Sequence, residues 1–84
     1  MGKMAVVLKI MPEDSETDLD EIEEQVRERI KVDDVEREEV AFGLEALKVS
    51  TITTDEEGGT DHLENELDDM EQVQSIEVES FNKI

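Results

Sequence analysis

Apolar residues recur along the chain at two different periods, which predicts a mixture of strands and helices. In the segment 3–11 every second residue is apolar on one face, an alternation typical of a strand. Pro12 ends this strand, because proline cannot donate a hydrogen bond to a neighbouring strand. Three further strands are predicted over residues 35–42, 44–54 and 73–84. The strand 35–42 is rich in carboxylates and is expected at a sheet edge, where charge discourages unwanted pairing.

A helical period appears first at Leu19, Ile22, Val26 and Ile30, which are spaced three or four residues apart. This stripe predicts an amphipathic helix of about four turns. Thr17 is the expected N-cap, and acidic residues follow it in the first turn, where the helix dipole favours negative charge. Basic residues gather at the other end, so the charges agree with the direction of the helix.

A second helix is predicted from Leu63, Leu67 and Met70, which repeat at the same period after the expected cap Thr60. Met70 is expected to fill space in the core. His62 is the single histidine of the chain and stands in the first turn of this helix. A metal site is not expected there, because no second nitrogen ligand is near, and an exposed position on the helix surface is the prediction.

The predicted order is strand, helix, strand, strand, helix, strand. Two right-handed crossovers place both helices on one face of a four-stranded antiparallel sheet. The sequence therefore predicts an α+β fold of the ferredoxin-like βαββαβ type, formed by residues 1–84 as one domain. The predicted core consists of Val6, Leu8, Ile10, Leu19, Ile22, Val26, Ile30, Leu47, Val49, Leu63, Leu67, Ile76 and Val78.

The net charge narrows the choice of partners. The 26 acidic and 8 basic residues give 8 − 26 = −18. This excludes nucleic-acid binding through a basic face and argues against docking on an anionic membrane. No apolar run approaches the length of a spanning helix and no apolar leader follows Met1, so the cytoplasm is the expected location. The absence of cysteine excludes disulfides and thiolate zinc sites.

Such acidity could indicate disorder, but the regular periods of the apolar residues favour a folded chain. An acidic, lysine-poor surface suits a cytoplasm with molar salt, where the screening length falls to about 3 Å and self-repulsion largely disappears. We therefore expect a halophilic protein, with an acidic domain in ordinary salt as the alternative.

Two places could make contact with a partner. Phe42 is one of two aromatic residues and precedes Gly43 between two predicted strands, where glycine permits a turn that other residues resist. Its ring could plug the core or point outward as an interface anchor, and the sequence leaves both possibilities open. Lys83 is the only Lys or Arg after Lys48. It could contact a partner, or it could be no more than a solubilising charge at the terminus.

No catalytic constellation is present. The single histidine lies in an acidic helix start, and carboxylate pairs are unavoidable at this composition. The sheet lacks the aromatic platform of an RNA-recognition domain. The glycine pair at 58–59 follows three acidic residues, so a structural turn is favoured over phosphate binding. These residues indicate a small binding module.

The chain resembles the archaeal elongation factor 1-beta family of guanine-nucleotide exchange factors. The resemblance covers the whole chain in order and is carried by Met1-Gly2-Lys3, Met11-Pro12-Glu13, Ala41-Phe42-Gly43-Leu44 with Ala46-Leu47, the segment 55–61, and Val73 and Val78 before a basic C-terminal end. It implies a ferredoxin-like fold and a partner, the GTPase elongation factor 1-alpha in its GDP-bound form. GDP would be released from that partner so that GTP can enter.

Three residues take their expected roles from this resemblance. Phe42 and Gly43 match the family's Phe-Gly hairpin, which contacts the GTPase. Lys83 matches a penultimate lysine that reaches toward the magnesium and phosphate region. An exchange factor changes a rate without making a covalent bond, so the chain is not expected to be an enzyme or to need a metal or cofactor. The excess acidity departs from ordinary members and agrees with the halophilic interpretation.

Two other functional classes remain as alternatives. One is an acidic, non-catalytic protein-interaction module of ferredoxin-like fold. The other is a ferredoxin-like hydrolase of the acylphosphatase type, for which the sequence offers no convincing arginine-loop anion site. Nucleotide release from the GTPase separates an exchange factor from a plain binder, and phosphatase turnover would support the enzyme.

Overall fold

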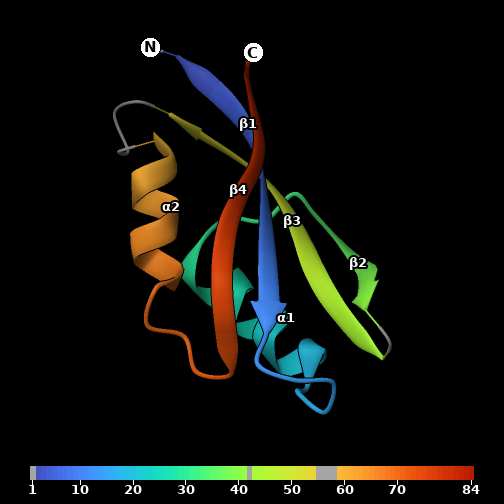
Figure 1. The fold of residues 1–84 in the computed structure, drawn as a ribbon. Coiled ribbons are helices and arrows are strands. Elements are labelled where there is room, and N and C mark those ends of the chain that lie inside the picture. The colour runs from blue at the N-terminus through green and yellow to red at the C-terminus, as the bar shows by residue number, and fades with distance from the viewer. Residues whose placement is uncertain (1, 42, 55–58) are drawn as a thin grey trace.

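The computed structural model describes residues 2–41, 43–54 and 59–84. Its elements are β1 (Lys3–Pro12), α1 (Leu19–Arg29), β2 (Asp34–Ala41), β3 (Leu44–Thr54), α2 (Gly59–Leu67) and β4 (Val73–Lys83). The four strands form one antiparallel sheet in the order β2-β3-β1-β4 (Figure 1). Element order and topology confirm the predicted ferredoxin-like α+β fold.

The central strand β1 carries the core. Its even-numbered residues are buried and its odd-numbered residues are half-buried or exposed, which confirms the predicted alternation. The buried side chains of β1 join one apolar cluster with residues of both helices: Met4, Val6, Leu8, Ile10, Ile22, Val26, Leu63 and Leu67. Burying each large aliphatic side chain stabilises the fold by about 1.5–3 kcal/mol. Both helices therefore cover the same face of the sheet, and the other face is open.

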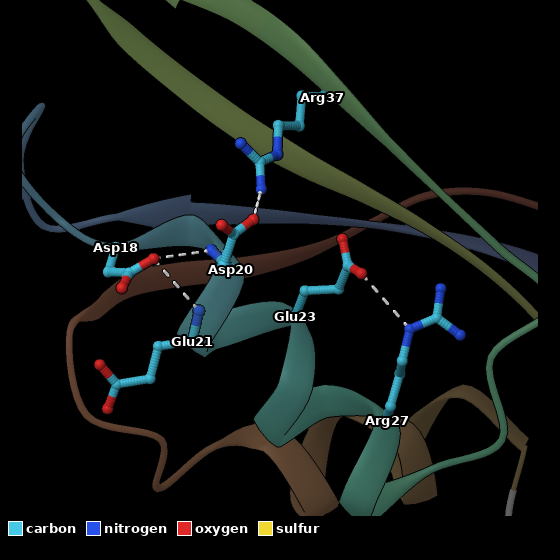
Figure 2. A network of polar contacts seen from close by, with 6 residues as sticks. All are labelled: Asp18, Asp20, Glu21, Glu23, Arg27 and Arg37. Atoms are coloured by element: carbon cyan, nitrogen blue, oxygen red, sulfur yellow. Dashed lines mark hydrogen bonds and ion pairs between the residues drawn. The ribbon is translucent and has the colours of Figure 1, made fainter.

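The start of α1 differs from the prediction. Asp18, not Thr17, is the N-cap, and its Oδ1 accepts hydrogen bonds from the backbone N–H of Asp20 at 3.0 Å and of Glu21 at 3.3 Å (Figure 2). Thr17 is instead engaged one turn earlier, where its hydroxyl donates to Asp14 Oδ1 at 3.2 Å. Since both residue types are good caps, the neighbouring turn decides between them.

The ends of the two helices meet. Helix α1 stops at Arg29, so it has about three turns and not four, and the next residue, Ile30, has an extended backbone. Arg29 Nη1 donates to the carbonyl oxygen of Glu66 at 3.0 Å and pairs with the Asp69 carboxylate. Helix α2 has no basic residue in its own last turn. Arg29 therefore supplies the cation that the C-terminal end of α2 lacks.

Helix α2 begins at Gly59, one residue before the predicted cap Thr60. Gly59 has φ +61°, and a Cβ there would lie 3.4 Å from the Met4 side chain. Met70 is buried after the helix has ended, which confirms it as core filler. His62 lies half-exposed on the helix, with Nδ1 4.0 Å from Glu66 Oε1. No helix in the described ranges is long and apolar enough to span a membrane.

Four side chains differ in burial from the prediction. Leu19, Ile76 and Val78 were expected in the core but are only partly buried and pack against its rim. The two β4 residues belong to an edge strand, and Leu19 opens a helix, so fewer neighbours surround them. Ala46 alternates with the predicted core residue Leu47 and so lies on the open face of the sheet, yet it is fully buried.

Candidate partner-binding site

The turn between β2 and β3 is formed around Gly43. Its φ of +72° lies in the left-handed region, which L-residues with a Cβ adopt at a cost. A register shift between Glu39 and Ala41 marks an irregularity in the strand that enters the turn. Phe42 lies outside the described residues, so the choice between core plug and outward anchor stays a prediction. Gly43 itself is exposed, as a contact in a hairpin requires.

Side chains from three elements restrain this hairpin end, by which we mean the Gly43 turn and the β1–α1 loop beside it. Arg37 projects from β2 and forms an ion pair with Asp20 in the first turn of α1 (Figure 2). A Cβ at position 43 would lie 3.9 Å from the Cβ of Ser15 in that loop. Arg37 and its carboxylate partner therefore connect the edge strand to the helix layer.

A polar pocket of about 200 Å³ opens at the hairpin end. Its lining consists of Pro12, Asp14, Ser15, Thr17, Asp18, Leu19, Asp20, Arg37, Gly43 and Glu45. Four carboxylates face one guanidinium in this lining, so a phosphate ligand is unfavourable there. Within the ranges that the structure describes, no group of three or more carboxylate or imidazole side chains could hold a metal ion.

Lys83 lies at the opposite end of the molecule. It is the last residue of β4 and stands beside Met4 of β1, and the next N–H, of Ile84, donates to the carbonyl of Lys3 at 2.9 Å. The Lys83 side chain is exposed and makes no ion pair with any described carboxylate. We call residues 81–84, with the adjoining start of β1, the C-terminal end.

The register of the sheet gives the distance between the two ends. Six residue steps of β1 separate Met4 from Ile10, and Ile10 stands beside Leu47. Three steps of β3 then separate Leu47 from Leu44, the residue after the Gly43 turn. At about 3.3 Å per residue, the turn and Lys83 lie about 30 Å apart. The long axis of the molecule measures 41 Å, so the two predicted contacts stand near its two tips.

A bulge in β4 sets the face on which Lys83 lies. Val78 stands beside Leu8 and Ser80 beside Val7, which leaves Glu79 as an extra residue. Since faces alternate along a strand, one extra residue exchanges the faces of every residue after it. Lys83 thus comes to the helix-covered side of the sheet, where regular alternation from Val78 would have placed it on the open side.

Lys48 joins the strands across the open face, a contact that sequence reasoning missed. Its Nζ lies 3.1 Å from Glu38 Oε2 of β2 and 3.1 Å from Glu79 Oε1 of β4. Hydrogen bonds to Glu38 and then to Glu79 raise the pKa of Lys48 above its usual value. The bulge residue is therefore held by an ammonium two strands away. Alternation in the sequence could have placed Lys48 and Glu38 on this face, but nothing in it indicated Glu79.

Comparison with known proteins decides the family. The sequence profile of the EF-1 guanine nucleotide exchange domain matches residues 5–84. The chain belongs to this family. Its curated relatives include elongation factor 1-beta of Haloarcula marismortui, 40% identical over the whole of both chains. The same protein of Natronomonas pharaonis is 41% identical over the whole of both chains. That of Methanocorpusculum labreanum is 35% identical over 100% of this chain and 99% of its own length.

Membership of this exchange-domain family confirms the function predicted from the sequence, guanine-nucleotide exchange in translation elongation, and does not favour the plain interaction module. All three relatives are archaeal, and the first two come from halophiles, in agreement with the expected source of the acidity. The family profile spans the Gly43 turn and Lys83, but it does not test their roles.

Proposed function

We propose that this chain, acting as one exchange domain over residues 1–84, accelerates the release of GDP from elongation factor 1-alpha so that GTP can replace it. The observation that carries the proposal is the match of the exchange-domain family over residues 5–84. The proposed reaction makes no covalent bond, takes place in the cytoplasm and requires no cofactor, nucleic acid or membrane on this side of the complex.

The geometry supports a contact at both tips of the molecule. Gly43 presents the hairpin at one end and Lys83 projects from the other, about 30 Å away by the register of the sheet. The sheet between them is tied into one unit by the backbone ladders and by the Lys48 ion pairs. The Phe42 contact would hold the factor on the GTPase while Lys83 reaches the nucleotide site.

Lys83 would compete with the magnesium ion whose positive charge helps to hold GDP in its site. GTPases bind the nucleotide phosphates through backbone N–H groups and a magnesium ion. A factor that binds preferentially to the conformation lacking magnesium must weaken nucleotide binding, because linkage between the two binding events is reciprocal. An ammonium placed near the phosphates supplies positive charge in competition with the ion. Since no described carboxylate pairs with Lys83, this charge is free to do so.

The test is the release of a fluorescent GDP analogue from preloaded elongation factor 1-alpha in a stopped-flow instrument. The experiment is run in molar potassium chloride with excess unlabelled GTP, and the concentration of the factor is varied. We expect the release rate to rise with factor concentration and to saturate. A complex that forms without faster release would leave a plain binding module, and the absence of any complex would refute the partner.

A further inference from the structure

The edge strand β4 carries an aromatic side chain that the fold does not use. Phe81 is 59% exposed, although Val6 beside it on β1 is buried. Its neighbours in sequence, Ser80 and Asn82, are polar and exposed. A phenyl ring on the surface of a chain with 26 carboxylates and only two aromatic residues leaves apolar area in water.

The β4 bulge places both Phe81 and Lys83 on the helix-covered face. Phe81 stands beside Val6 and Lys83 beside Met4, and both of these β1 residues point into the core. Alternate residues of a strand share a face and lie about 6–7 Å apart. An exposed ring and an exposed ammonium with no described ion partner therefore project together from the C-terminal end, on the helix-covered side of the edge strand.

Among the described residues, two further large apolar side chains are exposed at this end, those of Ile84 and Ile52, and that of Ile52 points the opposite way from Phe81. Ile52 of β3 is 44% exposed and stands beside Ala5, an odd-numbered residue of β1 whose side chain lies on the open face. The ring of Phe81 and the side chain of Ile52 are thus separated by the sheet. This difference provides a matched control, because the two side chains are comparable in exposure and share one end of the molecule.

We propose that Phe81 is a second hydrophobic contact for the GTPase, packing on an apolar surface beside the nucleotide site that Lys83 enters. This inference rests on the exchange function proposed above. A buried aromatic ring at an interface can carry much of the binding free energy. Salt screens attraction between charges but does not weaken apolar burial, so such a contact keeps its strength in the molar salt expected for this chain.

Phe81 and Lys83 are expected to affect different constants in the release assay. Phe81 contributes to forming the complex, and Lys83 contributes to expelling GDP once the complex exists. In the release assay, Phe81→Ala should raise the half-saturating concentration of the factor by about tenfold to thirtyfold. The maximal release rate should stay within about twofold, since the ammonium is still delivered at saturation. Phe81→Leu should recover most of the affinity, because apolar area is what the contact requires.

Ile52→Ala is the control and should leave both constants unchanged. Circular dichroism and melting temperature of every variant separate binding from folding. Equal half-saturating concentrations for the wild type and Phe81→Ala would overturn the inference. So would equal losses in Phe81→Ala and Ile52→Ala, or a lowered melting temperature in Phe81→Ala with normal affinity of the folded fraction.

Two further outcomes separate this inference from the function on which it rests. If the wild type releases no GDP at any concentration, the proposed exchange function fails. If the wild type releases GDP and Phe81→Ala behaves identically, only the role of Phe81 fails. A concentration-dependent dimer of the free factor that Phe81→Ala abolishes would assign the ring to a second copy of this chain and overturn the GTPase contact.

Discussion

The two ends of the sheet hold their side chains in different ways. At the hairpin end, Arg37 and Asp20 connect an edge strand to a helix, and the β1–α1 loop lies against the Gly43 turn. At the C-terminal end, Phe81 and Lys83 are exposed. The backbone there is held by the β1–β4 ladder and one final hydrogen bond, from Ile84 to the carbonyl of Lys3.

This difference suits the hairpin end to presenting a fixed binding surface and suits Lys83, at the C-terminal end, to delivering a charge. A restrained end presents a fixed surface, which favours affinity because little freedom is lost on binding. An end with free side chains can extend a long, charged group into a partner, and the flexible stem of lysine suits that task. We therefore expect that loss of Phe42 weakens binding to the GTPase, whereas loss of Lys83 lowers the maximal rate of GDP release.

The largest effect is expected from removing salt, which acts on both ends at once. With a net charge of −18, dialysis to about 10 mM salt extends the screening length to about 30 Å and leaves the carboxylates repelling one another. We expect circular dichroism to show loss of structure, and recovery in molar potassium chloride. Amide exchange at intermediate salt should show β2 opening first, since Glu36, Glu38 and Glu39 crowd one short edge strand. A spectrum that does not change would show that folding is independent of screening.

Phe42→Ala tests whether the hairpin end works through binding. As an outward anchor, Phe42 should contribute about 2 kcal/mol, so its loss should weaken binding to elongation factor 1-alpha by about thirtyfold with an unchanged melting temperature. As a core residue it should instead cost about 3–5 kcal/mol of stability. Titration calorimetry and thermal unfolding of the same sample decide. Normal affinity per folded molecule, combined with a large loss of stability, would remove the anchor.

Lys83→Ala tests whether the C-terminal end works through charge. We expect the maximal rate of GDP release to fall by about tenfold, with an unchanged melting temperature because the side chain is exposed and unpaired with described carboxylates. Lys83→Arg should retain part of the activity. The effect should shrink when magnesium is chelated, since the proposed task is then already done. Equal rates for wild type and Lys83→Ala at millimolar magnesium would leave the C-terminal end without a role for this charge.

At the hairpin end, Arg37→Met tests whether the ion pair with Asp20 contributes to stability without contributing to the rate of GDP release. The Arg37 side chain is 40% exposed and that of Asp20 85%, so the pair is largely solvated. Its loss should lower stability by less than about 1 kcal/mol and leave the maximal release rate unchanged. Asp20→Asn should give a similar change in chemical denaturation, and the double variant should be no worse than either single one. Additive losses would show that the two side chains act independently.

The smallest expected effect is on the pH dependence of stability. It involves the ion pair of Arg29 with Asp69, which belongs to neither the hairpin end nor the C-terminal end. Hydrogen bonding to Arg29 holds the pKa of Asp69 below its usual value of 3.8. A depressed folded-state pKa stabilises the fold above the unfolded-state pKa, and this contribution disappears as the pH falls through the folded-state value. Asp69→Asn should therefore be slightly less stable than the wild type at pH 6 but equally stable at a pH well below 3.8, where the carboxyl group is protonated in both the folded and the unfolded state. Denaturation curves at both pH values test this, and a difference that persists in acid would contradict it.

Sequence reasoning succeeded where a pattern repeats and failed where one residue decides. The alternation of β1 extends over a whole strand with one apolar face, so a shift by one residue would expose the core. The cap of α1 was misplaced because Thr17 and Asp18 are both competent, and contact with Asp14 selects between them. The bulge at Glu79 leaves no mark on the composition of β4, so the face of Lys83 could not be derived.

The candidate site was predicted in part. Gly43 indicated the turn through its missing Cβ, and the structure confirms a left-handed backbone there. The roles of Phe42 and Lys83 came from family resemblance, and their residue types alone do not distinguish a contact from a core plug or a terminal charge. Ion pairs such as those of Lys48 arise from strands brought together by the fold, which no local pattern encodes.

The dependence of α2 on Arg29 has a consequence for how the chain folds during synthesis. A helix of nine residues is marginal by itself, and this one lacks a cation of its own at the end where the backbone carbonyls accumulate. The guanidinium that meets the Glu66 carbonyl is encoded 37 residues earlier, so it leaves the ribosome before α2 does. The growing chain thus has the stabilising charge ready when the second helix emerges, whereas a circular permutant that begins with α2 would have to wait for it.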